Sequence, residues 1–159
     1  MRVYVRAIVG SLACGVVLAA LPRIEARQAA SGSTHVIVPA DKVAFGPIEV
    51  PGFPSGMKIA AISGDPYAES GEYVIRLQFP DGYTFPAHWH PMAENLTVLS
   101  GTLVLGMGDK ADSSKLATYS PGTFMSIPGK MAHFGGARGA TVIQLHGQGP
   151  FKIELVTAK

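Results

Sequence analysis

The chain has 159 residues, of which 47% are hydrophobic and 15% charged, and its formal net charge is +2 at pH 7. The first thirty residues hold four arginines and one glutamate, so they carry +3 and the remainder carries −1, which excludes the basic stripe of a nucleic-acid-binding protein. The single cysteine, Cys14, lies within those thirty residues, so disulfide bonds cannot stabilise the rest of the chain.

Residues 1–30 are predicted to be a secretory signal peptide. Arg2 and Arg6 precede Ala7–Leu21, a run of fifteen uncharged residues, which is too short for a membrane span of about 20 residues. No clear cleavage site follows the run, so processing is expected anywhere from about Ala20 to Ala30. A retained membrane anchor and lipidation at Cys14 are the alternatives. We expect the mature protein in the periplasm or secreted.

The rest of the chain divides into an N-terminal arm or linker, residues 31–54, and a β-barrel domain, residues 55–159. The arm is rich in Gly, Pro and Ser, whereas the domain is a succession of short β-prone segments bounded by Gly, Pro, Asp or Ser. Many short strands without a long helical period predict an all-β sandwich or barrel. The predicted strands are Met57–Ser63, Glu72–Phe79, Thr84–His88, Glu94–Ser100, Thr102–Gly106, Thr123–Ile127, Ala132–Phe134, Thr141–His146 and Phe151–Val156.

Several turns are expected between these strands. Ser100-Gly101 lies between two apolar runs and predicts a tight hairpin. Pro121-Gly122 and Pro128-Gly129 suit type II turns, in which proline fixes the first central residue and glycine accepts a positive φ at the second. Met107–Leu116 is the one long polar loop.

Three side chains that commonly bind metals lie within seven positions, at His88, His90 and Glu94. Side chains two residues apart on a strand point to the same face, so both imidazoles are expected on one side of the sheet. Pro91 cannot donate to a sheet ladder and therefore marks a bend, which lets the Glu94 carboxylate return toward the imidazoles. This stretch predicts a metal site.

The spacing resembles the first signature motif of the cupin superfamily. Five residues separate Gly82 from His88-Trp89-His90, three residues precede Glu94, and six more lead to Gly101. The second cupin motif is matched by Gly122, Pro128 and His133, with two departures from it. Lys130 stands where a glycine is expected, although Gly129 can supply the turn, and Ala137 replaces a terminal Asn.

The resemblance spans roughly Val43 to Val156 and implies a single-domain double-stranded β-helix, the cupin jelly-roll barrel. It also implies one divalent transition metal, Fe, Mn, Ni, Cu, Co or Zn, bound by His88, His90, Glu94 and His133. Such a ligand set leaves an octahedral ion two positions short, where water, dioxygen or a chelating substrate would bind. The alternative is a barrel that has lost its metal and keeps these four as hydrogen-bonded core residues.

Three further polar residues are weaker candidates, which would contact either a metal ligand or the substrate. Gln144 and His146 share one face of a predicted strand, and Gln144 would support a ligand or bound water if that face lines the barrel. Arg76 would bind an anionic substrate from the interior, or else lie on the polar outside of the sheet.

Together these features predict an exported, metal-dependent cupin that acts as an enzyme on a small organic substrate, with a dioxygenase-like oxidoreductase favoured. The alternative is a non-catalytic metal-binding or small-molecule-binding module or sensor. The chain also resembles the small cupins related to ChrR-type anti-sigma factors through His-Trp-His-Pro and Thr-Val-Leu-Ser-Gly-Thr, but it lacks a helical sigma-binding domain. The expected partner is a small-molecule substrate or ligand. We expect no binding to nucleic acid, and no binding to a membrane once the leader is cleaved. A homodimer is possible.

Overall fold

The computed structural model of the protein describes residues 35–157, which contain nine β-strands and two short 3-10 helices. The predicted leader, residues 1–30, lies outside the described residues. Within the described range, no helix is long and apolar enough to cross a membrane. The elements in chain order are η1 (Ala40–Lys42), β1 (Gly46–Pro47), β2 (Lys58–Ser63), β3 (Glu72–Phe79), β4 (Thr84–Trp89), β5 (Glu94–Met107), η2 (Ser113–Lys115), β6 (Ala117–Tyr119), β7 (Phe124–Ile127), β8 (His133–Gln148) and β9 (Glu154–Leu155).

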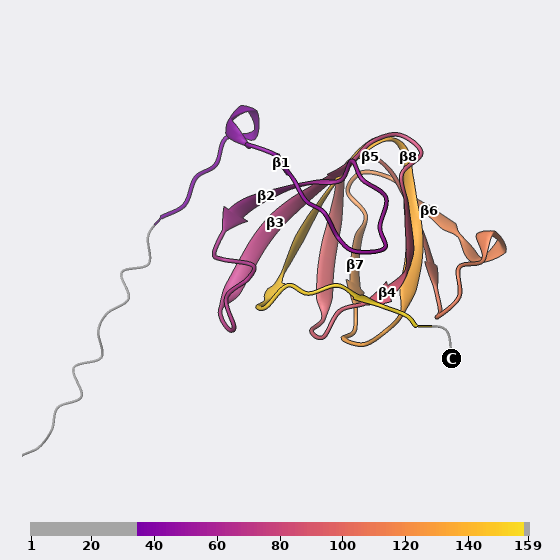
Figure 1. Cartoon of the computed structure of the whole chain (residues 1–159). Helices are drawn as coiled ribbons and strands as arrows, with labels where there is room; N and C mark the ends of the chain where they lie inside the picture. Colours follow the sequence, from indigo (N-terminus) through magenta and orange to yellow (C-terminus); the bar gives the residue numbers. More distant parts are fainter. Residues whose placement is uncertain (1–34, 158–159) are drawn as a thin grey trace, which may run out of the picture. The chain divides into compact units, whose positions relative to one another are not determined.

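Strand β8 organises the sheet. On one side it pairs with β5 over almost its whole length, and on the other it pairs first with β4 and then with β3. Strands β2 and β1 continue the sheet beyond β3, while β9 pairs with β4, and β6 and β7 pair with β5. All these pairings are antiparallel, and the sheet curls round into a barrel (Figure 1). The expected all-β fold with a single domain is confirmed.

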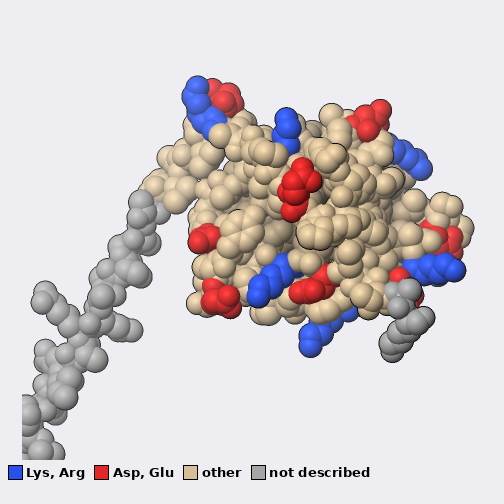
Figure 2. All heavy atoms as spheres, in the orientation of Figure 1, with Lys and Arg blue, Asp and Glu red and all other residues tan. Residues whose placement is uncertain are grey.

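The core fills the inside of the barrel because the strands alternate between buried and partly exposed residues. In β3 the buried side chains are Tyr73, Ile75, Leu77 and Phe79, each separated by a more exposed neighbour. This period of two is that of a sheet with one face turned to the core. On the outside, the face drawn in Figure 2 carries acidic and basic side chains side by side, and neither sign gathers into a stripe there.

The predicted hairpin at Ser100-Gly101 is wrong, because β5 runs through this position as one strand. The pairing with β8 shifts register on either side of Ser100, and Gly101 has a φ of 74°. This is a β-bulge, which bends a strand and moves its inward-facing residues by one position. The buried side chains accordingly change from Leu96 and Val98 before the bulge to Leu103 and Leu105 after it. A Cβ at position 101 would meet the Ala140 carbonyl oxygen.

Two other strand boundaries differ from the prediction. Ala132–Phe134 and Thr141–His146 were predicted as separate strands but are parts of β8, and the glycines between them do not end the strand. Strand β6 was not predicted, and it follows directly on the segment that was expected to be a loop.

Residues 46–57 contribute to the barrel. In β1, Gly46 and Pro47 pair with Ile59 and Lys58 of β2, so β1 and β2 form a hairpin. The Ile48 amide donates a 3.2 Å hydrogen bond to the Met57 carbonyl, which closes the base of the connecting loop. This loop, residues 48–57, is called the strap below. It runs across the front of the barrel in Figure 1.

Candidate metal centre

Four predicted ligands converge at one end of the barrel interior. His88 lies in β4 and is paired directly opposite His133, the first residue of β8. His90 follows the end of β4, and Glu94 is the first residue of β5. All four are buried, with His133 only 2% exposed. The sheet therefore brings together side chains that the sequence places in two separate motifs.

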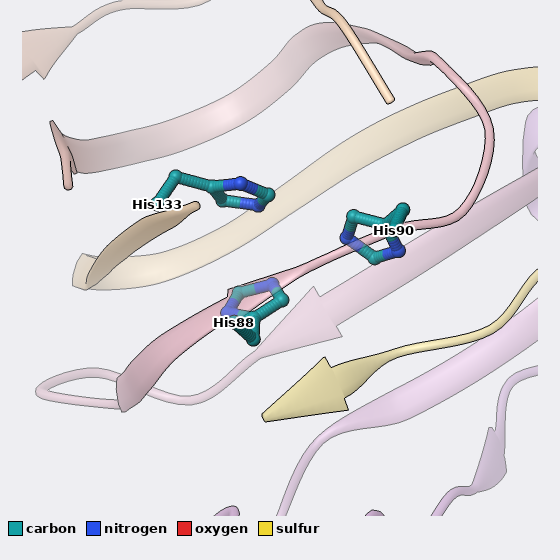
Figure 3. A group of neighbouring side chains, drawn as sticks. All are labelled: His88, His90 and His133. Atoms are coloured by element: carbon teal, nitrogen blue, oxygen red, sulfur yellow. The ribbon is translucent and has the colours of Figure 1, made fainter. Parts of the chain in front are cut away.

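The three imidazoles form a cluster that fits one ion. A ring nitrogen from each of His88, His90 and His133 lies within 4.8 Å of the other two, and Figure 3 shows the three rings gathered between the strands. Two ligands on opposite sides of one transition-metal ion are about 4 Å apart, so a single ion could contact all three.

Backbone hydrogen bonds orient every ring. The Nδ1 atom of His88 lies 2.8 Å from the Pro86 carbonyl oxygen, that of His90 lies 2.7 Å from Lys152 O, and that of His133 lies 3.1 Å from Met131 O. Because a carbonyl oxygen only accepts, each Nδ1 donates its proton and each neutral ring keeps a lone pair on Nε2. Such contacts hold metal-binding histidines in the correct tautomer.

Glu94 completes the set from the other side. Its Oε2 lies 3.3 Å from His133 Nε2 and 3.5 Å from His90 Nε2. Both His90 Nε2 and Glu94 Oε2 are buried without a hydrogen-bond partner. Lone pairs of neutral imidazoles that face a carboxylate oxygen repel each other unless a cation lies between them, and an unpartnered buried polar group is costly. The donor set therefore fits a divalent metal.

The pKa directions of His88, His90 and Glu94 agree with a cation-binding pocket, whereas that of His133 reflects its contact with Glu94. Burial, followed by the nearby charge of His133, lowers the pKa of His88 to about 3. Burial also lowers the pKa of His90. For His133, burial acts downward, but contact with the Glu94 carboxylate raises the pKa overall. Burial alone would raise the pKa of Glu94, but contact with His133 and the charges of the histidines lower it. The carboxylate thus stays ionised, and His88 and His90 stay neutral.

Beside the four side chains lies a cavity of about 30 Å³. Apart from these four, every residue that lines it is apolar: Phe53, Met57, Leu77, Phe79, Phe85, Leu96, Leu103, Leu105, Ile143, Phe151 and Ile153. The metal ligands are therefore the only polar groups available to a molecule bound there.

The turn before His133 differs from the prediction. The positive φ expected at Gly129 is at Lys130 instead, with a value of 64°. Gly129 has another role, because a Cβ there would lie 2.7 Å from the Pro91 carbonyl oxygen. The Lys130 amide donates a 2.7 Å hydrogen bond to His90 O, so this turn connects the backbone of two ligand segments.

Arg76, Gln144 and His146 lie outside the barrel. Arg76 is paired with Gln144 in the sheet, and its Nε donates a 3.1 Å hydrogen bond to Gln144 Oε1. The inward face of β8 instead carries Thr141, Ile143 and Leu145, all buried. None of the three candidates lines this cavity, and Arg76 takes the second of its two expected positions, on the polar outside of the sheet.

Phe53 is a residue of the site that the sequence interpretation missed. It lies in the segment expected to be an arm, yet its ring packs edge-to-face on His88 with centroids 5.1 Å apart. The available signal was an aromatic residue between Gly52 and Pro54. Gly and Pro indicate a turn, and a large apolar side chain in a turn is stabilised by burial against the domain.

Comparisons with known proteins agree on the fold. Residues 75–145 match the family model described as the cupin domain. No curated protein matches the chain significantly. Among solved structures, the polyketide cyclase RemF from Streptomyces resistomycificus is 17% identical, with 79% of this chain and 88% of that chain covered and a TM-score of 0.63.

Two further structures align in the same way. A candidate acetylacetone dioxygenase from Methylibium petroleiphilum PM1 is 17% identical over 74% of this chain and 79% of that chain, with a TM-score of 0.58. A cupin 2 conserved barrel domain protein from Rhodopseudomonas palustris is 15% identical over 73% of this chain and 79% of its own, with a TM-score of 0.58. At these identities the likeness shows the fold alone.

Proposed function

Because the chain carries a cupin domain with a buried cluster of three histidines and a glutamate, we propose that it is a metal-dependent enzyme acting on a small organic substrate. The observation that carries this proposal is the set of converging Nε2 and Oε2 atoms, two of them unpartnered, at the wall of an apolar cavity. A dioxygenase-like oxidation is the favoured reaction class.

The protein side chains have defined roles in this proposal. His88, His90, His133 and Glu94 would hold the ion, and the Pro86, Lys152 and Met131 carbonyls keep the imidazoles oriented. When bound, the ion would supply Lewis-acid polarisation of a substrate oxygen, together with redox capacity if it is Fe, Mn, Ni or Cu. The apolar lining excludes water and leaves Glu94 as the only carboxylate in the cavity.

The competing proposal is a non-catalytic metal-binding or small-molecule-binding module. It is favoured by the cavity of about 30 Å³, which has room for only one or two water molecules. Three histidines and one glutamate also close a tetrahedron, as in structural zinc sites.

Metal analysis followed by oxygen-uptake screening tests the proposal. The protein is purified from its native compartment, its metal is identified, and uptake is measured with small diketones, flavonols, phenols and oxalate. We expect stoichiometric Fe, Mn, Ni or Cu and substrate-dependent uptake that is lost in Glu94→Gln. Tightly held zinc without uptake for any compound would favour the binding module instead.

We also propose that the protein is exported, on the basis of the leader-like sequence of residues 1–30. Cell fractionation followed by N-terminal sequencing should find a processed chain in the periplasm or medium that begins within residues 21–31. A full-length cytoplasmic form would contradict export. Recovery only in membranes would favour the anchor or the Cys14 lipoprotein.

A further inference from the structure

Resting on the proposed function, we propose that Phe53 determines which molecules reach the metal. The site would take small chelating molecules with one pair of oxygen donors and an apolar body, and that body would occupy the place of the Phe53 ring.

Phe53 is an apolar side chain inserted into the barrel from an exposed loop. It is half buried, whereas Gly52 and Pro54 on either side of it are exposed. Its ring contacts His88, and the strap that carries it crosses the front of the barrel (Figure 1). The Phe53 side chain therefore extends from the strap to the metal ligands.

The strap is held by hydrogen bonds and by Ile48, Val50 and Phe53, which pack against the core. The Phe53 amide donates a 2.9 Å hydrogen bond to Val50 O within the loop, and the Tyr83 hydroxyl donates a 2.8 Å bond to Pro54 O. The other aromatic residues of the lining, among them Phe79 and Phe85, project from strands or belong to the buried core cluster. Phe53 is only partly buried and projects from a loop, so displacing it breaks no strand pairing.

The size of the cavity favours such a displacement. A volume of about 30 Å³ holds one or two waters, so an organic ligand bound at the metal would gain room inside the barrel if a lining side chain moved. If Phe53 moves outward, the ligand can contact His88 and the apolar residues that line the cavity.

The lining also selects the chemistry of the ligand. Apart from the four metal ligands it offers no charged or hydrogen-bonding side chain, and Arg76, the nearest candidate cation in the sequence interpretation, lies outside. Oxygens pointing away from the metal would therefore be buried without partners, which is costly. A chelator with methyl groups at those positions pays no such penalty.

Pentane-2,4-dione and malonate form a matched pair for this test, because malonate has outer oxygens where the diketone has methyl groups. Binding is measured on the Co(II)-loaded protein from the visible absorption of the ion. For each ligand, the affinity for the Co(II)-loaded protein is divided by its affinity for aqueous Co(II). This ratio should be at least about tenfold higher for the diketone than for malonate. Equal or better relative binding of malonate would overturn the chemical part of the inference.

Phe53→Ala tests the gate, with 1-phenylbutane-1,3-dione as the larger probe. Removing the ring should tighten binding of this probe by about 3- to 10-fold, the cost of exposing a half-buried phenylalanine. The matched control is Phe124→Ala, because Phe124 is 58% exposed and does not line the cavity. Phe53→Leu, which keeps an apolar contact with His88, serves if the alanine variant does not fold, and it should give a smaller gain.

The outcomes separate this inference from the proposed function. If chelators perturb the Co(II) spectrum but neither Phe53 variant binds the larger probe more tightly, or Phe124→Ala gains equally, the role of Phe53 is refuted and the open metal site stands. If no chelator perturbs the spectrum in the wild type or in the Phe53 variants, the site is closed, and both proposals fall.

Discussion

Replacing Lys130 by glycine should stabilise the protein. Lys130 has a φ of 64°, and the left-handed conformation costs a residue with a Cβ about 1–2 kcal/mol. Glycine returns about 0.5–1 kcal/mol of this through its greater freedom in the unfolded chain. The net gain in the free energy of unfolding is about 0.5–1 kcal/mol, which corresponds to a rise in Tm of about 2–5 °C for a domain of this size.

Denaturation of the metal-free protein is the appropriate assay, because a bound ion would add its own contribution to stability. Lys130 is exposed, so Lys130→Ala, which keeps the Cβ, should leave Tm within about 1 °C. Gly129→Ala should destabilise the protein by more than 1 kcal/mol, since its Cβ would lie 2.7 Å from Pro91 O. The reasoning is refuted if Lys130→Gly melts at or below the wild type, or if Gly129→Ala is neutral.

His133→Ala should reduce bound metal at least about tenfold, while His146→Ala, an outer-face control, should retain it; equal metal content by elemental analysis would remove the site. The metal-free protein should lose stability as the pH falls from 6.5 toward 3. The pKa of His88 is lowered to about 3 in the folded protein, so in this range the unfolded chain binds a proton at His88 and the folded chain does not. The raised pKa of His133 acts in the opposite direction. In urea titrations at several pH values, His88→Asn should flatten this profile, and a wild-type profile that is level between pH 7 and 4 would contradict it. Gly101→Ala should lower the free energy of unfolding by more than about 2 kcal/mol, because residue 101 has a positive φ and an added Cβ would meet the Ala140 carbonyl oxygen. A loss below about 0.5 kcal/mol in denaturation would show that the bulge does not require glycine.

The ligand set could be predicted from the sequence because its members lie at fixed spacing around a bend. His88 and His90 share a face by strand alternation, and Pro91 marks the point where the chain turns toward Glu94. His133 required the resemblance to a known motif, since nothing local to it indicates that β8 pairs it with His88. A pairing between strands so far apart in sequence is a tertiary property.

The errors have a common physical origin in glycine. Gly101 was expected to form a hairpin, and the glycine-containing segment between Phe134 and Thr141 was expected to separate two strands, yet the barrel uses both inside β5 and β8. A glycine signals only that the backbone bends, and the partner strand decides whether the bend is a turn or a bulge. The outward placement of Arg76, Gln144 and His146, in contrast, agrees with the alternation of their strands, because the intervening positions of β3 and β8 carry the buried residues of the core face.

The opposition of His88 and His133 in the β4–β8 ladder has a consequence for the order in which the protein acquires its ion. The two residues are forty-five positions apart, so their nitrogens come within reach of one cation only after β8 has docked. A complete set of four ligands therefore forms only when β4 and β8 have paired, whereas His88, His90 and Glu94 are close enough in sequence to meet a cation earlier. If the proposed leader exports an unfolded chain, the site would be completed outside the cytoplasm. The identity of the bound ion would then depend both on the donor atoms and on which ions are available in that compartment.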